Sequence, residues 1–212
     1  MADNTVADNT VADNTVADDT VADPVPVARS PIAPAPPVGV LAGWEVSLAR
    51  SDAALTLADW TPLAKVLVHA EPDSPPVRFG SAARSADTTL VVGWAPGQSL
   101  LLGAPGSGQD LVALRPGDAL DLTSAFALLR LTGAQVSGLL AKVCALDLAR
   151  APDGAVFRSS VAKVAATLVR DDRAGVPSYL VACDRSLGAY LHGALLDAGG
   201  EFGIEPTGFD GP

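Results

Sequence analysis

The chain has 212 residues, and 49% of them are hydrophobic, which is enough for one domain, or two small ones, without disulfides. A formal net charge of −10, with only 14 lysines and arginines, argues against a phosphate-neutralising nucleic-acid surface. The two cysteines, Cys144 and Cys183, are too few for a secreted disulfide scaffold, so we expect buried free thiols. No stretch reaches the roughly 18 consecutive apolar residues of a membrane helix, and the N-terminus lacks signal-peptide features. We therefore expect a cytoplasmic protein.

The N-terminal 37 residues differ in composition from the rest. Residues 2–23 repeat the five-residue unit ADNTV and contain six aspartates and no basic residue, so removing them leaves a net charge of −4. We expect an acidic, disordered tail, with a binding tag for a basic partner as the alternative. Residues 24–37 contain six prolines and predict an extended, plain linker, with a segment that lies along a neighbouring subunit as the alternative. We therefore assign residues 1–37 as disordered.

From Trp44 onward the composition becomes globular. Alternating apolar residues predict a strand at Leu63–Ala70, and a strand pair follows at Thr88–Gly93 and Ser99–Gly103 with a turn between them. Ser107 is placed to cap a short helix that runs to about Leu114. A tight turn is then expected at Arg115–Asp118.

The stretch from Asp121 to Gly203 predicts a strand, a helix, two strands and a second helix. The first strand is expected at Thr123–Thr132, and the next two at Ser160–Arg170 and Ser178–Cys183, joined by the polar loop Asp171–Gly175. Both helices are predicted from apolar residues that recur at helical spacing, from Val136 to Val143 and from Leu187 to Ala198. Thr132 and Gln135 fit a capping box before the first helix, and Gly199-Gly200 ends the second.

These elements predict an α+β fold made of two consecutive small strand/helix sub-units, at residues 38–115 and 116–204. Together they form one domain at 38–204. Residues 205–212 contain Pro206, Gly208 and Gly211, and we expect a loose C-terminal tail there.

A search for reactive groups yields no catalytic, cofactor-binding or metal-binding residue. His69 and His192 have no partner at metal-ligand spacing, whereas a structural zinc site needs four ligands. The glycine-rich stretch Gly103–Gly108 lacks the lysine of a phosphate-binding loop and departs from the dinucleotide fingerprint, so a flexible turn is expected. No G-x-S-x-G nucleophile elbow occurs.

Several short motifs carry a family resemblance in one consistent order. They read SPIA, LADWTPLA, SLLLG, DLTSA, LRLTG, LLAKVCALDL, RS, ALLDA and EFG, within residues 30–203. The series resembles the gamma subunit of heterotetrameric sarcosine oxidase, best over its second half. That half is also similar to the folate-binding aminomethyltransferase of the glycine cleavage system.

The resemblance implies a non-catalytic gamma subunit that assembles with alpha, beta and delta subunits. In that family the complex demethylates sarcosine oxidatively to glycine and passes the one-carbon unit to tetrahydrofolate. FAD, FMN, NAD and tetrahydrofolate are then expected on the partner subunits and none on this chain. One alternative is a stand-alone folate-binding aminomethyltransferase-like protein. Another is a binding module unrelated to sarcosine.

The folate-binding alternative points to two groups of residues. Arg158, Lys163 and Arg185 are candidates for an anionic-ligand site that would hold a folate carboxylate. Trp44, Trp60 and Trp94 are candidates for a wall on which a pterin would stack. For the basic residues we favour a set of solvated surface charges, and for the tryptophans we favour core or interface positions.

Overall fold

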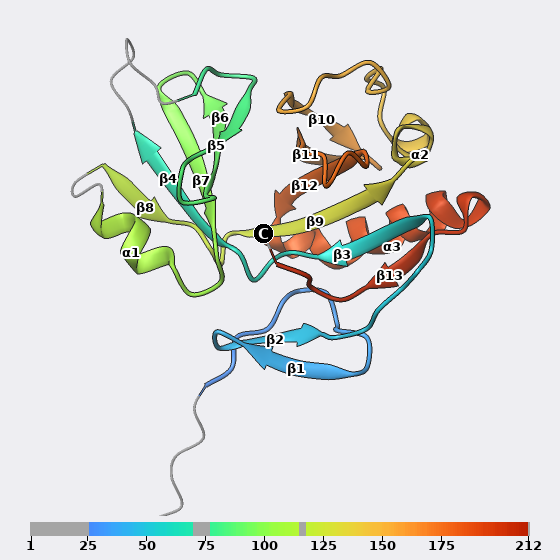
Figure 1. Ribbon diagram of the computed structural model, residues 1–212, viewed down its shortest axis with the longest axis horizontal. Coiled ribbons are helices and arrows are strands. Elements are labelled where there is room, and N and C mark those ends of the chain that lie inside the picture. The colour runs from blue at the N-terminus through green and yellow to red at the C-terminus, as the bar shows by residue number, and fades with distance from the viewer. Residues whose placement is uncertain (1–25, 70–76, 115–117, 212) are drawn as a thin grey trace, which may run out of the picture.

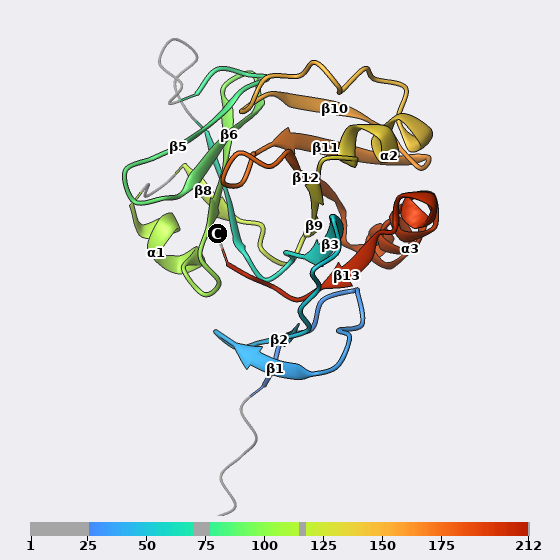
Figure 2. The ribbon, with the colours of Figure 1, turned by 45° about the vertical axis from the view of Figure 1, so that its right-hand side comes forward.

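The computed structural model describes residues 26–69, 77–114 and 118–211, and two β-sheets packed face to face form its centre (Figures 1 and 2). The large sheet has the strand order β10 (Val156–Val161), β11 (Val164–Arg170), β12 (Ser178–Asp184), β9 (Phe126–Gly133), β3 (Leu55–Asp59) and β13 (Glu205–Thr207). The small sheet has the order β5 (Ala82–Arg84), β6 (Leu90–Ala95), β7 (Gln98–Gly103), β4 (Ala64–His69) and β8 (Ala119–Asp121).

The remaining elements surround these two sheets. Strands β1 (Val38–Leu41) and β2 (Trp44–Ser47) form a separate two-stranded sheet. The helices are α1 (Gly108–Ala113), α2 (Val136–Val143) and α3 (Gly188–Gly199), with 3-10 turns η1 (Arg185–Leu187) and η2 (Gly200–Phe202). Helices α2 and α3 cover the outer face of the large sheet, and α1 covers the outer face of the small sheet. The α+β class expected from the sequence is confirmed.

The large sheet is buried on both faces because alternate residues of its central strands enter different cores. In β9, Leu129 and Leu131 pack against the helices, whereas Leu128 faces the small sheet. In β12, Val181 points to the helices and Leu180 to the small sheet. A strand buried on both faces is apolar at nearly every position, which explains the long apolar runs in the sequence.

The boundary that we predicted between two consecutive sub-units, at residues 115 and 116, is wrong. Strand β3, from the first half of the chain, pairs antiparallel with β9 of the second half. Strand β8, from the second half, pairs with β4 of the first. The two sheets therefore exchange strands across the expected boundary at 115/116, and the halves share one core between the sheets.

The single strand predicted at Ser160–Arg170 is two strands joined in a tight hairpin. Strands β10 and β11 pair from Val156↔Val169 to Val161↔Val164. The turn residues Ala162 and Lys163 have φ angles of 47° and 68°, a left-handed pair that suits a two-residue hairpin turn. The prediction missed the turn because neither residue is a glycine or an asparagine. The Asp171–Gly175 connection to β12 is confirmed as a hairpin loop.

The capping box predicted at Thr132 and Gln135 is also wrong. Thr132 belongs to β9, and its hydroxyl lies 3.1 Å from the hydroxyl of Ser178 on β12. Gln135 is the N-cap residue of α2, and its side chain makes no capping hydrogen bond. The helix itself, and the helix expected from Leu187 to Ala198, are confirmed as α2 and α3.

Residues 26–37, here called the strap, lie against the domain, although we expected them to be a disordered linker. Ile32 is 5% exposed and belongs to the core between α3 and the large sheet. The amide of Ala28 donates to the carbonyl of Gly43 at 2.7 Å, and the amide of Glu45 donates to the carbonyl of Ala28 at 2.9 Å. The strap thereby extends β2 on the edge that β1 leaves open. The apolar residues between its prolines explain the docking.

The C-terminal residues expected to be a loose tail are part of the large sheet. Strand β13 runs parallel to β3 at its edge, with Glu205 opposite Thr56. Phe209 is buried and its ring centroid lies 5.5 Å from that of Trp60. The acidic repeat at 2–23, Ala70 and most of the predicted turn at 115–118 lie outside the described residues.

Candidate functional site

The three basic residues proposed for an anionic-ligand site lie in different surroundings. Arg158 lies on β10, with its guanidinium carbon 5.1 Å from the centre of the Trp94 ring. Lys163 is exposed in the turn between β10 and β11. Arg185 donates to the carbonyl of Arg29 in the strap and stacks 5.8 Å from the ring of Trp44. The structure therefore does not bring the three together as one site.

The three tryptophans occupy core positions, which we favoured for them from the sequence. All three are buried in the core between the sheets, and Trp60 lies against Phe209 there. Trp94 also borders an open cleft, and its ring centroid lies 5.4 Å from that of Phe126. One of the three basic candidates, Arg158, and one of the three aromatic candidates, Trp94, thus meet in this cleft.

The Trp94 cleft is formed where one end of the large sheet faces β6. It has a volume of about 280 Å³ and is lined by Trp94, Phe126, Arg158, Ser159, Ala165, Ala166, Thr167, Ala182, Cys183 and Asp184. That volume lies just under the range of roughly 300–1,000 Å³ of small-molecule sites. Sequence reasoning missed Phe126 and Asp184 because β9 and β12 reach the cleft only through sheet pairing.

The charges in the cleft suit binding and not acid–base chemistry. Hydrogen bonds from the side chain and backbone of Ser186 lower the pKa of Asp184 below its usual value. Burial, with the nearby charge of Asp184, raises the pKa of the Cys183 thiol to about 11. The thiol is therefore protonated at neutral pH and is a poor nucleophile. The cleft offers a guanidinium, a carboxylate and an aromatic wall, which together fit a planar polar ligand.

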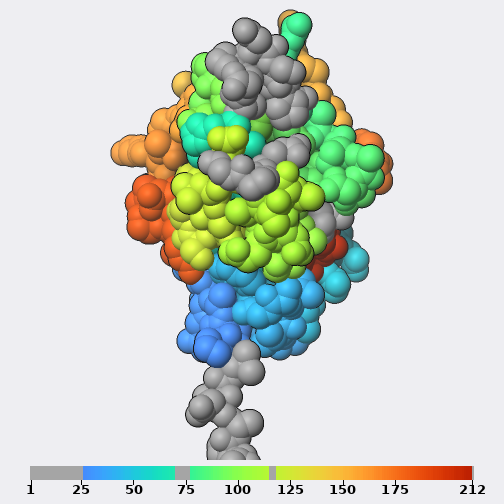
Figure 3. All heavy atoms as spheres, turned by 90° about the vertical axis from the view of Figure 1, so that its left-hand side faces the viewer, coloured from blue at the N-terminus to red at the C-terminus, as the bar shows by residue number. Residues whose placement is uncertain are grey.

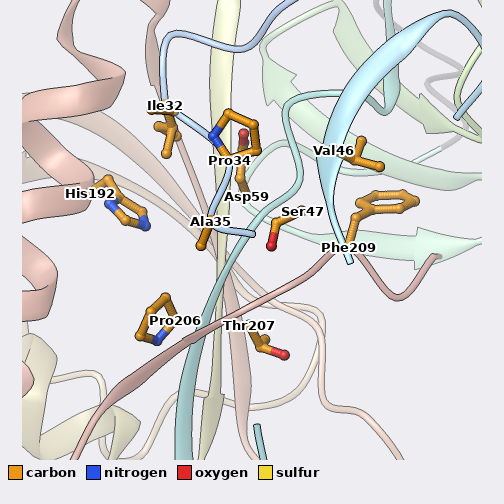
Figure 4. Close-up of a pocket in the computed structure, with 11 residues that line it drawn as sticks. Ile32, Pro34, Ala35, Val46, Ser47, Asp59, His192, Pro206, Thr207 and Phe209 are labelled. Atoms are coloured by element: carbon orange, nitrogen blue, oxygen red, sulfur yellow. The ribbon is translucent and has the colours of Figure 1, made fainter. Parts of the chain in front are cut away.

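A second cavity lies beneath the strap (Figure 4). Its volume is about 40 Å³, and it is lined by strap residues together with Val46, Ser47, Asp59, His192, Pro206, Thr207 and Phe209. Burial lowers the pKa of His192, and the negative charge of Asp59 opposes that shift. The sequence did not link these two residues because they come from β3 and α3. The cavity has room for ordered water and not for a folate.

Buried charges between the sheets were also missed from the sequence. Asp171 accepts hydrogen bonds from the guanidinium groups of Arg84 and Arg130, and Arg130 is almost fully buried. Lys65 is fully buried as well, with different partners, the carbonyls of Thr61, Leu63 and Thr123. The sequence feature that could have revealed these buried charges is a single basic residue inside an apolar strand, as in the runs ALLRLT and AKVLV.

The glycine-rich stretch borders a hollow of about 250 Å³ and has the form of a turn. Gly103 ends β7, and the Ser107 hydroxyl donates to the carbonyl of Ala104 at 2.8 Å, so the glycine-rich stretch is a turn closed on itself. No group of three His, Cys, Asp or Glu side chains gathers in metal-ligand geometry among the described residues. Within the described ranges no helix is long and apolar enough to cross a membrane.

Comparison with known proteins places the fold. No protein-family model matches the chain. No curated protein matches it either. Among solved structures, a chain of the heterotetrameric sarcosine oxidase from Corynebacterium sp. U-96, in complex with pyrrole 2-carboxylate, is similar at a TM-score of 0.58 and 23% identity. The match covers 73% of this chain and 88% of that one.

The glycine cleavage system aminomethyltransferase T from Bartonella henselae is similar at a TM-score of 0.64 and 18% identity. The match covers 81% of this chain but 55% of the aminomethyltransferase, so the chain spans about half of that enzyme's length. The resemblance seen in the sequence is thus confirmed for both proteins at the level of the fold. The chain has an α+β fold of the type shared by a sarcosine oxidase chain and an aminomethyltransferase.

Proposed function

We propose that this chain is the non-catalytic gamma subunit of a heterotetrameric sarcosine oxidase. The observation that supports it most directly is the extent of the structural match. The match covers 88% of the sarcosine oxidase chain and only 55% of the aminomethyltransferase. In this proposal the alpha, beta and delta subunits are its partners, and they carry the flavins, NAD and tetrahydrofolate in the cytoplasm.

An exposed apolar strand supports an assembled state. Val38, Val40 and Leu41 of β1 are all exposed, and among the described residues β1 pairs with β2 alone. The segment that contains β1 and β2 forms one end of the described molecule (blue in Figure 3). A free apolar edge strand is normally protected or paired, because its open N–H and C=O groups invite another chain. We assign this strand to the contact with a larger subunit.

Purification from the native cell tests the assembly. An N-terminally tagged chain expressed from its own locus should co-purify with flavin-containing chains, and the isolated complex should oxidise sarcosine. The chain on its own should not. Recovery of a stable monomer without flavoproteins, or sarcosine turnover by the isolated chain, contradicts the proposal.

A matched pair of variants tests the contact strand. Val40→Glu places a charge on β1, at a residue that is 64% exposed. Leu120→Glu is the control and places a charge on β8, at a residue that is 55% exposed. Val40→Glu should weaken complex recovery at least tenfold, since burying an unpaired charge in an interface costs roughly 2 kcal/mol or more. Leu120→Glu should leave recovery unchanged. Both variants should keep the unfolding temperature of the wild-type chain.

The Trp94 cleft supports the alternative function, a stand-alone folate-binding protein. Arg158 over Trp94 is suited to a planar ring that carries an anionic group. Calorimetry of the isolated chain with tetrahydrofolate tests this alternative, with Arg158→Gln as the binding variant. Arg150→Gln, at an arginine outside the cleft, is the control. Absence of binding heat with the wild-type chain excludes this alternative and leaves the subunit proposal standing.

A further inference from the structure

The Trp94 cleft lies where the side chains of the large sheet become smaller. On the face that meets the small sheet, Leu180 is followed two residues later by Ala182 in β12. In the neighbouring β11, Val169 is preceded by Thr167 on the same face, since residues two apart in a strand share a face. The smaller side chains do not fill the space between the sheets, and the cleft of about 280 Å³ remains there.

Some of the polar groups that line the cleft are paired within the protein. The hydroxyl of Ser159 accepts from the thiol of Cys144 at 3.7 Å. The thiol of Cys183 donates to the carbonyl of the next residue at 3.3 Å. The backbone groups of the lining strands pair in the ladders of β10, β11 and β12. Among the described residues, the lining side chains with polar atoms that no other group binds are Trp94, Arg158, Thr167 and Asp184.

The guanidinium of Arg158 forms one wall of the cleft. Its central carbon lies 5.1 Å from the centre of the Trp94 ring, and this cation–π contact holds the group over the ring. It forms no ion pair and no side-chain hydrogen bond with the described residues. A guanidinium presents a planar fork of N–H donors that matches a carboxylate. This wall therefore offers a positive charge in a geometry suited to a carboxylate.

A fixed carboxylate lines the same cleft. Asp184 ends β12, and its Oδ1 accepts hydrogen bonds from the amide and the hydroxyl of Ser186 at 2.9 and 2.6 Å. Its Oδ2 accepts none from the described residues. The hydrogen bonds from Ser186 hold the carboxylate in place and lower its pKa, so that it is ionised at neutral pH. The free oxygen is an acceptor for an ammonium group.

The register of the large sheet sets the separation of these two charges. Arg158 on β10 lies opposite Thr167 on β11, which lies opposite Ala182 on β12. Asp184 follows two residues after Ala182. Two strand spacings and two residues along the strand separate the Cα atoms of Arg158 and Asp184 by about 12 Å. The two side chains form no ion pair with each other, so a small ligand with two opposite charges fits between them.

The floor between the two charges carries an unpaired hydroxyl. Thr167 is only 2% exposed, and its hydroxyl makes no hydrogen bond with the described residues. Because Val169 on the same face belongs to the core between the sheets, the Thr167 side chain also points between the sheets, into the cleft. Buried hydroxyl groups in native structures normally have a partner. A ligand in the cleft provides one.

The combination of charges selects the class of ligand. A simple anion on Arg158 leaves the Asp184 carboxylate unpaired and adds a second negative charge beside it. A simple cation on Asp184 likewise leaves Arg158 unpaired. A zwitterion pairs both groups at once, and an α-amino acid carries its two charges on one carbon atom. Phe126 and Ala165 provide an apolar surface for its side chain.

We propose that the Trp94 cleft binds a free α-amino acid with an apolar side chain. Its carboxylate accepts from Arg158, its ammonium donates to Asp184, and its side chain lies against Phe126. Such a ligand is smaller than a folate, in agreement with a volume just under the range of small-molecule sites. Binding occurs on the isolated chain, so it is independent of assembly with other subunits.

Calorimetry and tryptophan fluorescence of the isolated full-length chain test the class of ligand. At least one of L-phenylalanine and L-leucine should bind along a saturable curve. L-phenylalaninamide lacks the carboxylate and 3-phenylpropanoate lacks the ammonium. Each should bind at least tenfold more weakly than L-phenylalanine, since each loses one charge-assisted contact. The proposal is overturned if neither amino acid binds. It is also overturned if 3-phenylpropanoate binds as tightly as L-phenylalanine, which indicates a site for a simple anion.

Two variants assign the charges to residues. Asp184→Asn keeps an acceptor for Ser186 but removes the negative charge, so it should weaken binding of L-phenylalanine at least tenfold and leave 3-phenylpropanoate at least as tightly bound as before. Arg158→Gln should weaken the binding of both ligands. An equal loss of both ligands in Asp184→Asn contradicts the assignment of the ammonium to this carboxylate.

Asp147→Asn is the matched control for Asp184→Asn. Asp147 also accepts from a backbone amide two residues further on, that of Ala149 at 3.2 Å, and it lies outside the cleft. The affinities of this variant should equal those of the wild-type chain. A loss as large as that of Asp184→Asn shows a general effect of charge and overturns the site. Where a variant does not fold, the analogue series on the wild-type chain decides alone.

Discussion

Lys65 is buried and forms no ion pair with any carboxylate of the described residues. Its Nζ donates to the backbone carbonyls of Thr61, Leu63 and Thr123 at 2.6, 2.9 and 3.1 Å. Burial lowers its pKa to about 7, and the more distant charge of Asp59 opposes that shift. The carbonyls tie the start of β4 to the segment that precedes β9, so this lysine joins the two sheets at one corner.

The lowered pKa of Lys65 makes stability depend on pH. Between about pH 7 and the ordinary lysine pKa near 10.5, the unfolded chain binds a proton that the folded chain has released. The free energy of unfolding should therefore rise with pH from 7 to 9, with a slope of at most about 1.4 kcal/mol per pH unit. This window lies above the ordinary pKa of His192. The Cys183 thiol, whose pKa is raised from 9.0 to about 11, opposes the rise as the pH approaches 9, so the slope is steepest near pH 8.

Two substitutions isolate this contribution in urea unfolding measured from pH 7 to pH 9. Lys65→Met removes the titrating group and should flatten the profile. Lys142→Met changes a surface lysine that pairs with Glu201 at 2.9 Å, and it should leave the slope as in the wild-type chain. A profile that is flat in the wild-type chain shows that Lys65 keeps its proton in the folded state.

At the scale of a single element, β9 is the strand on which both cores depend, and Gly133 determines where it ends. Gly133 has a φ angle of 145°, and a Cβ atom there would lie 2.2 Å from the carbonyl oxygen of Ala54. This close approach lets β3 pair with β9 up to Leu55 opposite Gly133. The sequence predicted only that Gly133 ends the strand.

Substitution at Gly133 should therefore be severe. Gly133→Ala combines an unfavourable φ with a backbone clash and should cost about 3 kcal/mol or more. Gly193→Ala in α3 is the matched control, because nothing lies within 4 Å of the Cβ position there. Since alanine favours a helix over glycine, this control should stabilise by about 0.5–1 kcal/mol. Urea unfolding of both variants measures the change in the free energy of unfolding, which should be negative for Gly133→Ala and positive for Gly193→Ala.

At the scale of the whole molecule, the C-terminal residues close the large sheet and cover its core. Phe209 packs against Trp60, and the amide of Gly208 donates to the carbonyl of Ala49 at 2.8 Å. Strand β13 also covers the edge of β3. The strap and β13, which come from opposite ends of the sequence, therefore lie close together, because both border the cavity lined by Asp59 and His192.

Loss of this closure should destabilise the whole domain. Phe209→Ala removes a buried ring from the core between the sheets and should cost about 3–5 kcal/mol. Phe209→Leu keeps most of the apolar volume and should recover more than half of that loss. Thermal unfolding followed by tryptophan fluorescence measures both. Equal unfolding temperatures for Phe209→Ala and the wild-type chain would restore the expectation of a loose tail.

The sequence predicted elements well where the signal was local. Helix α2 follows from apolar residues at Val136, Leu139 and Leu140, and the hairpin of β6 and β7 follows from two apolar runs around a proline-glycine turn. The sequence failed to predict the turn at Ala162 and Lys163, because neither of these residues with positive φ angles is a glycine or an asparagine. For the candidate site it supplied Arg158 and Trp94, and it also supplied Lys163 and Arg185, which lie elsewhere.

By itself the sequence determined the α+β class, both longer helices, the hairpins β6–β7 and β11–β12 and the family likeness, because these depend on residues close together in the chain. Only the tertiary structure decided that β3 and β8 change partners between the halves, that the strap and the C-terminus dock, and that Arg130 and Lys65 are buried between the sheets. Strand pairing and the burial of a charge depend on partners distant in sequence. Local periodicity carries no information about those partners.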